Sequence, residues 1–211
     1  DWAIRAVLLV GLPAAVVLAL LSGPMLSTLF QHGIFNGHSV IMASQSLSAF
    51  AVGIAPFMLV KILASGFYAR QDMRTPVKIG VVAMLSNIML NVALIYPLKH
   101  MGIALATSLS AIVNMSCLYY FLRQHGHYAP RDGWGLFAIR LFTANVVLAA
   151  WLWYGTDNIQ IWIDAATMWR VTHLAFLLGT SVVLYFAVLW ITGIRPHDLL
   201  IPQKHLAAES K

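Results

Sequence analysis

Six long apolar runs constrain this chain more than any other feature of its sequence. Each comes close to the about 20 apolar residues with which a helix crosses a hydrocarbon core of about 30 Å. None alternates apolar and polar residues as barrel strands do, and backbone groups in lipid then have to pair within helices. We expect an all-α polytopic membrane helix bundle with about six transmembrane helices, at Ala3–Ser22, Val40–Tyr68, Ile79–Tyr96, Met101–Leu122, Trp134–Tyr154 and Trp169–Thr192.

The composition indicates that lipid is the main solvent of the fold. Hydrophobic residues make up 60% of the 211 residues and charged residues 9%, with a mean hydropathy of +0.80. An ordinary soluble domain is about 25% charged. The net charge of +6 is spread between the apolar runs rather than gathered on one stripe, so we expect no nucleic acid partner. The single cysteine, Cys117, excludes a disulfide within the chain and a metal site built on cysteines.

The ends of the first two runs have distinctive sequences. The chain enters its first run directly after Asp1, without an initiator Met, so we expect a fragment that lacks an upstream part. Met25 to His38 is interpreted as a short interfacial helix and a turn. The second run would measure roughly 43 Å as a straight helix, and Gly53 and Pro56 predict a kink near its middle. Aromatic residues at span ends are expected to anchor the interface, at Trp134, Tyr154, Trp162 and Trp169.

Basic residues favour the connectors on one side of the predicted spans. The other side carries Asp157 and Asp164, with Lys99 in a short turn and Arg170 at the edge of a loop. Lys and Arg mark cytoplasmic loops, so we expect the basic side, and with it both chain ends, to be cytoplasmic. The basic side holds Arg70, Arg74, Lys78, Arg123, Arg131, Arg195, Lys204 and Lys211.

Enzyme motifs are nearly absent. There is no Gly-rich phosphate loop, no Gly-x-Ser-x-Gly and no His-Glu-x-x-His. His127 and Asp132 match a His-x4-Asp spacing known from acyltransferases, but they lie in a short connector with Pro130 and lack the fold that supports a general base. We therefore expect that the chain is not an enzyme.

Polar side chains inside the spans are the candidate functional residues, because burying them is costly unless they are paired. Lys61 lies in the second span, where it either snorkels to the surface or lines a cavity. Asn87 and Asn91 share one face of the third span.

The fourth span carries a matching polar stripe of Thr107, Ser110 and Asn114. Because the two spans are antiparallel around a short turn, the two stripes are expected at similar depth. They either form an oxygen-rich site for a hard cation such as Na⁺ or pair through ordinary interhelical hydrogen bonds.

Three connectors have distinctive sequences: Gly66–Lys78, Leu29–Phe35 and Pro97–Gly102. Together they resemble the MurJ (MviN) lipid II flippase family, which belongs to a larger flippase and multidrug-exporter superfamily. The resemblance implies the C-terminal part of a fourteen-helix flippase. Residues 1–125 would be the last four helices of the C-terminal transport lobe, residues 126–195 an extra helix pair beside a lipid groove, and residues 196–211 a cytoplasmic tail.

The resemblance also implies a function. Lipid II, an undecaprenyl-pyrophosphate-linked precursor of peptidoglycan, would move from the cytoplasmic to the periplasmic leaflet of the bacterial inner membrane by alternating access. Its headgroup needs a protein path, because a pyrophosphate does not cross bare hydrocarbon. The expected partners are lipid II, membrane lipids and the missing N-terminal helices. Arg70, Asp72 and Arg74 form either a hinge or gate latch or simply a positive-inside connector.

Some members of this family use a sodium site. Its ligands correspond here to Asn87, Asn91, Thr107 and the carbonyl of Ile103, with Asn91 in place of an aspartate. Sodium is therefore an open question as a coupling ion, and no other cofactor is expected. Two other functions stay open, namely a cation-coupled exporter of drugs or lipid-linked oligosaccharides and a membrane scaffold that does not transport.

Overall fold

The computed structural model describes residues 2–33, 35–124 and 133–193, and every regular element in these ranges is a helix. The predicted tail at 196–211, Arg131 and the pair His127 and Asp132 lie outside the described residues. The helices are α1 (Trp2–Leu20), α2 (Ser22–Phe30), α3 (Gly37–Ala51), α4 (Ile54–Tyr68), α5 (Arg74–Gln124), α6 (Trp134–Gly155), α7 (Ile159–Asp164) and α8 (Thr167–Ile191).

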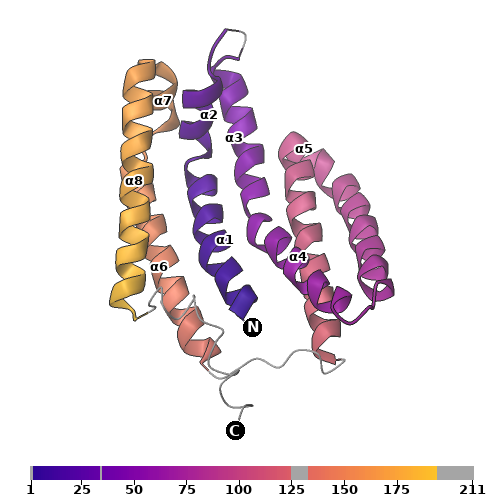
Figure 1. The fold of residues 1–211 in the computed structure, drawn as a ribbon. Helices are drawn as coiled ribbons and strands as arrows, with labels where there is room; N and C mark the ends of the chain where they lie inside the picture. Colours follow the sequence, from indigo (N-terminus) through magenta and orange to yellow (C-terminus); the bar gives the residue numbers. More distant parts are fainter. Residues whose placement is uncertain (1, 34, 125–132, 194–211) are drawn as a thin grey trace.

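The predicted six crossings are confirmed within the described residues. Five continuous segments are long and apolar enough to span a membrane, and α3 with α4 forms one of them. The 51 residues of α5 are enough for two crossings, and the chain reverses at Lys99, where φ is 49° and ψ is −129°. Figure 1 shows the two limbs of α5 running antiparallel beside α4.

Gly102 lets the two limbs of α5 approach each other close to this reversal. A Cβ on Gly102 would collide with the carbonyl group of Leu94, whose carbon atom would lie only 2.7 Å away. Since real Cβ contacts do not become so short, a larger residue at this position would force the limbs apart. The limbs therefore pack backbone against backbone where they meet.

The kink predicted in the second span is confirmed. α3 ends at Ala51 and α4 begins at Ile54, so that Gly53 lies in the break. A Cβ on Gly53 would lie 2.8 Å from the Oγ atom of Ser108 and 3.1 Å from its Cα atom. Ser108 Oγ in turn donates to the carbonyls of Ala49, at 2.8 Å, and Phe50, at 3.3 Å. A hydroxyl from α5 thus supplies a donor to the carbonyl of Ala49, whereas the carbonyl of Phe50 also accepts from the N–H of Gly53, at 3.0 Å.

In the first and third spans, three predicted helix ends differ from the structure by a few residues. The first span ends at Leu20, before the expected Ser22, and Pro24 lies in the first turn of α2, where its missing N–H leaves no gap in the hydrogen bonding. The third span does not begin at Ile79: helix already starts at Arg74, and it continues past Pro97 to the reversal at Lys99.

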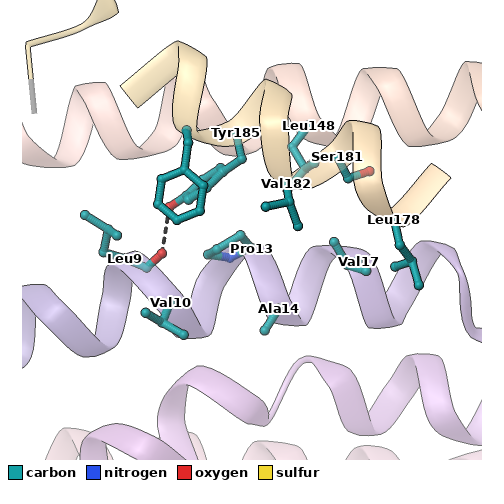
Figure 2. A pocket seen from close by; sticks show the side chains of 11 residues that line it. Leu9, Val10, Pro13, Ala14, Val17, Leu148, Leu178, Ser181, Val182 and Tyr185 are labelled. Atoms are coloured by element: carbon teal, nitrogen blue, oxygen red, sulfur yellow. Dashed lines mark hydrogen bonds between the residues drawn. The ribbon is translucent and has the colours of Figure 1, made fainter. Parts of the chain in front are cut away.

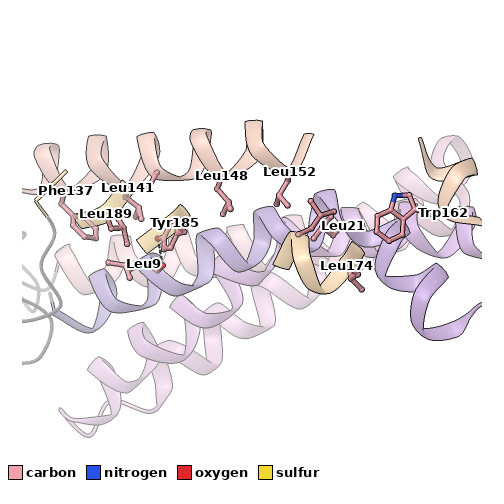
Figure 3. Packing of buried hydrophobic residues seen from close by; sticks show 12 residues of the cluster. Leu9, Leu21, Phe137, Leu141, Leu148, Leu152, Trp162, Leu174, Tyr185 and Leu189 are labelled. Atoms are coloured by element: carbon pink, nitrogen blue, oxygen red, sulfur yellow. Dashed lines mark hydrogen bonds between the residues drawn. The ribbon is translucent and has the colours of Figure 1, made fainter. Parts of the chain in front are cut away.

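The larger hydrophobic core joins α1 to α6, α7 and α8 (Figure 3). Buried residues recur along α6 every three or four positions, which gives a single stripe toward α1 and α8. Trp162 on α7 is fully buried in this core, so its prediction as an interfacial anchor is wrong, whereas Tyr154 is 87% exposed. The cluster contains Leu9, Leu21, Phe137, Leu141, Ala144, Leu148, Leu152, Trp162, Leu174, Leu177, Tyr185 and Leu189.

A second core joins α1 to α4 and α5 and lies nearer one end of the bundle. It contains Ile4, Leu59, Leu63, Phe67, Ile79, Leu118 and Leu122. The start of α1, the α4–α5 connector, the end of α5 and the start of α6 lie at this same end in Figure 1. We call it the basic end, because it carries Arg5, Arg70, Arg74, Lys78 and Arg123. The prediction that the described basic connectors share one side is thereby confirmed.

Ser108→Ala tests whether the break in the second span depends on the donated hydroxyl. We expect a loss of about 1–3 kcal/mol in stability, the cost of leaving the carbonyl of buried Ala49 without a partner. The measurement is the thermal unfolding of the complete protein in detergent. Ser116→Ala, on the exposed face of the same limb, is the matched control and should change nothing; equal effects of the two variants would contradict the assignment.

Candidate functional site

A chain of hydrogen bonds connects the polar residues of the two α5 limbs. Asn91 Nδ2 donates to Asn87 Oδ1 at 2.9 Å, and Asn87 Nδ2 donates to Ser110 Oγ at 3.2 Å. Ser110 Oγ donates to the carbonyl of Thr107 at 2.8 Å, and Thr107 Oγ1 donates to the carbonyl of Ile103 at 2.9 Å. The four residues predicted as a sodium site are thus brought together, with Ser110 as the bridge between the limbs.

The direction of donation in this chain follows from its end. A backbone carbonyl only accepts, so the hydroxyl of Ser110 must donate to Thr107 and accept from Asn87. The amide of Asn87 then turns its oxygen toward Asn91, and Asn91 has to present its NH₂ group. The remaining oxygen of Asn91, Oδ1, is buried and has no hydrogen-bond partner in the structure.

A groove beside this chain is lined from both limbs of α5 and from α4. Its polar members are Asn87, Thr107, Ser110 and Asn114, and its volume is about 310 Å³. These groups are neutral oxygens and amides, and the described residues contain no group of three or more His, Cys, Asp and Glu side chains that could hold a metal ion. Amide, hydroxyl and carbonyl oxygens suit Na⁺ in kind, although the groove lacks a carboxylate that would favour a bound cation.

Asn91→Asp tests the sodium prediction, which stays open. A carboxylate at this position would face the oxygen of Asn87, and two acceptors in contact require a cation or a rearrangement between them. We expect the variant to melt at a lower temperature than the parent in K⁺ and to regain stability in Na⁺.

The matched control for that experiment is Asn145→Asp in α6. Asn145 likewise uses its Nδ2 atom to donate within its own span, in this case to the backbone carbonyl of Leu141, at 2.8 Å. It lies outside the α5 chain, so its substitution should not create a sodium response. A parent protein already stabilised by Na⁺ over K⁺ would show that the native amides bind the ion.

Lys61 lies on an exposed face of α4, with Ser65 and Tyr68 one and two turns further on. It does not line the polar groove, to which α4 contributes Phe57 and Val60. The exposed position of Lys61 is compatible with both interpretations, in which the ammonium either snorkels to the membrane surface or lines a cavity. Its role in a cavity stays a prediction.

The predicted gate residues lie together in the α4–α5 connector at the basic end. Arg70 and Arg74 are exposed. Asp72 Oδ1 accepts hydrogen bonds from the backbone N–H groups of Arg74 and Thr75, each at 3.1 Å, and so caps the start of α5. The structure thereby gives Asp72 a local role in the connector, and the role of the three residues as a gate stays a prediction.

Two substitutions of Asp72 separate capping from charge. Asp72→Asn keeps a side-chain oxygen at the cap position, so we expect it to retain stability and transport. Asp72→Ala removes the cap and should cost about 1 kcal/mol, measured by thermal unfolding. Loss of transport in Asp72→Asn at normal protein levels would instead assign the function to the carboxylate charge, as a gate requires.

Three apolar grooves lie along α1. One lies between α1 and α8 and has a volume of about 260 Å³; Figure 2 shows it, with Pro13 and Tyr185 in its wall. A second, of about 550 Å³, lies between α1 and α6, and a third, of about 480 Å³, lies between α1, α4 and α5. The second and third share Leu8 and Trp134, so apolar surface continues on both sides of Trp134.

Several structurally important residues were missed by sequence reasoning. Tyr185 donates to the carbonyl of Leu9 at 2.7 Å, and Arg5 stacks its guanidinium over Trp134, at 5.1 Å from the ring centre. Arg170, predicted at a loop edge, is buried and donates to the carbonyls of Ser27 and Ile163. Pro13 in α1 indicates from the sequence that the carbonyl of Leu9 lacks a helical donor. The hydroxyl that replaces this donor lies 176 positions further along the chain, on Tyr185.

The comparisons with known proteins agree on one family. The model of the family "Lipid II flippase MurJ" matches residues 1–191. A protein of Haemophilus influenzae named "Probable lipid II flippase MurJ" is 40% identical over 200 residues, covering 95% of this chain and 39% of the relative. The "Lipid II flippase MurJ" of Burkholderia cenocepacia is 34% identical, covering 92% and 38%.

A solved structure supports the fold. It is described as "Lipid II flippase MurJ, inward closed conformation", and it matches with a TM-score of 0.67 at 20% identity, over 91% of this chain and 38% of that one. The chain thus spans less than two fifths of the length of the relatives it matches. From the family match over residues 1–191 and the identity to these relatives, the chain belongs to the lipid II flippase MurJ family.

Proposed function

We propose that this chain is part of a flippase that moves lipid II from the cytoplasmic to the periplasmic leaflet of the bacterial inner membrane by alternating access. The observation that carries the proposal is the 40% identity to a relative with this name over 95% of the chain. The function is transport rather than catalysis. The partners are lipid II, membrane lipids and helices of the same protein outside this chain.

The distribution of charge supports an orientation of the chain in the membrane. The basic end carries most of the described Lys and Arg residues, and such residues mark the cytoplasmic side. Arg170, on the opposite side, has its charge buried against backbone carbonyls and does not weigh against this orientation. We therefore place the basic end, with the start of α1 and the α4–α5 connector, in the cytoplasm.

The division between polar and apolar grooves suits a lipid with a charged headgroup. The groove beside Asn87 and Ser110 offers hydrogen-bonding groups, while the grooves along α1 are almost wholly apolar. A hydrocarbon tail is stable against the latter or in the bilayer, whereas the headgroup needs a polar path. The charged groups of that path are assigned to the helices outside this chain.

Complementation tests the proposal. In bacteria depleted of their own lipid II flippase, we expect the complete protein to restore growth and to expose lipid II at the periplasmic face. Residues 1–211 alone should not, because the chain covers only about two fifths of its relatives. Growth restored by residues 1–211 alone would contradict the proposed dependence on further helices.

A binding comparison separates the two other functions. An exporter of the same superfamily would bind organic cations in preference to lipid II, and this result would replace the proposal. A scaffold would complement equally well with Arg70→Ala, because its function needs no transport cycle. Lipid II binding together with transport lost in Arg70→Ala at normal protein levels supports a flippase.

A further inference from the structure

The proline in the first helix creates a specific gap in hydrogen bonding. Pro13 lies in the interior of α1 and has no N–H group, so the carbonyl of Leu9, four residues earlier, loses its helical donor. Leu9 is buried, and the span lies where water does not substitute for a lost donor. A carbonyl in this situation needs a partner from another helix.

The missing donor comes from α8. The hydroxyl of Tyr185 donates to the carbonyl of Leu9 at 2.7 Å, and Tyr185 is itself 5% exposed. Figure 2 shows this bond directly beside Pro13. Tyr185 belongs to the buried stripe of α8, four residues after Ser181 and four before Leu189, so packing directs its ring toward α1. A phenylalanine would fill the same space but leave the carbonyl unpaired.

We propose that Tyr185 is a positioning residue that replaces the hydrogen bond lost at Pro13 and so fastens α6 and α8 to α1 within their spans. Pro13 is then a fixed point in a continuous α1 rather than a free hinge. Without this bond, the carbonyl of buried Leu9 has no donor in place of the one that Pro13 cannot supply. The helix pair α6 and α8 is therefore part of the support of α1.

Contacts at both ends of the same helices agree with a fastened pair. At the basic end, the guanidinium of Arg5 on α1 lies 5.1 Å from the ring centre of Trp134 and 5.5 Å from that of Phe137, both on α6. At the opposite end, Arg170 on α8 donates to the carbonyl of Ser27 on α2 at 3.0 Å. The hydrogen bond of Tyr185 lies between these two contacts along the bundle and joins α8 to α1.

Short α7 adds to the attachment at the outer level. A Cβ on Gly23 of α2 would lie 2.7 Å from Ile159, and one on Gly37 of α3 would lie 2.7 Å from Ile163. Glycine at both positions lets α7 rest on the backbone of its neighbours. Gln31 also donates to the carbonyl of Ile163, at 2.9 Å. The segment between α6 and α8 is therefore fixed to α2 and α3.

A double-mutant cycle on the complete protein tests the proposal. Tyr185→Phe should change the ratio of folded to unfolded protein about tenfold at the parent's melting midpoint, as expected for one unpaired buried group. Pro13→Ala restores an N–H group at position 13, so Tyr185→Phe should have little effect in that background. This rescue is specific to the hydrogen bond, because a loss of packing at Tyr185 would be the same in both backgrounds.

Tyr154→Phe serves as the matched control, since Tyr154 is 87% exposed and should tolerate loss of its hydroxyl. An equal effect of Tyr185→Phe in both backgrounds would overturn the proposal, and so would no effect in the parent. If Tyr185→Phe alone does not accumulate in the membrane, its recovery in the Pro13→Ala background supports the proposal and its continued absence overturns it.

The consequence for transport rests on the proposed flippase function. Tyr185→Phe should lower lipid II flipping per folded molecule several-fold, and Pro13→Ala should restore it. Melting is measured without substrate, so the hydrogen bond is tested even where transport of lipid II is not found. Normal flipping by folded Tyr185→Phe would overturn the importance of the hydrogen bond for transport.

Discussion

The whole fold depends on keeping backbone carbonyls hydrogen-bonded where there is no water. A regular helix does this internally, but in this chain the helical hydrogen bonding is incomplete at Pro13 in α1, at the junction of α1 and α2, and at the junction of α3 and α4. Each of these three places receives a hydroxyl from a neighbouring helix. Tyr185 donates to Leu9 O, Ser48 to Ala19 O at 3.0 Å, and Ser108 to Ala49 O and Phe50 O. The donors come from α8, α3 and α5, so these three places fix which helices must be neighbours.

The hairpin of α5 applies the same rule to side chains. Asn87, Asn91 and Ser110 would be costly if each faced hydrocarbon alone, and they are instead joined in one directed chain of hydrogen bonds. This series of hydrogen bonds ends on the backbone carbonyl of Thr107. Of the side-chain nitrogen and oxygen atoms of these three residues, only Asn91 Oδ1 has no partner. The result is a polar line without net charge along the groove. Any cation bound there would have to compete with bonds that the residues already make.

How much of the site could be predicted differs from residue to residue. The spacing of Asn87, Asn91, Thr107 and Ser110 was sufficient to place them at one depth, because the turn between the limbs is short. The connector with Arg70, Asp72 and Arg74 was recognisable as a family motif from its residues. The capping hydrogen bonds of Asp72 were not, because they depend on the local backbone conformation. Trp162 was assigned to the interface because it is aromatic and near a span end. Trp162 is buried because it lies on α7, which packs against the bundle. The sequence does not predict this helix, because its six residues are too few to show a helical period.

The sequence by itself determined that the chain is a membrane helix bundle, where its spans lie to within a few residues and which connectors share the basic side. Apolar length and the placement of Lys and Arg act locally along the chain, so they can be read without the fold. Only the tertiary structure decided that Tyr185 donates to the carbonyl left unpaired by Pro13, that Ser108 donates to the carbonyl of Ala49 before the break at Gly53, and that Arg170 is buried. These pairings join residues far apart in sequence. They form because an unpaired polar group is costly where water is absent, and the packing of the helices decides which donor lies within reach of it.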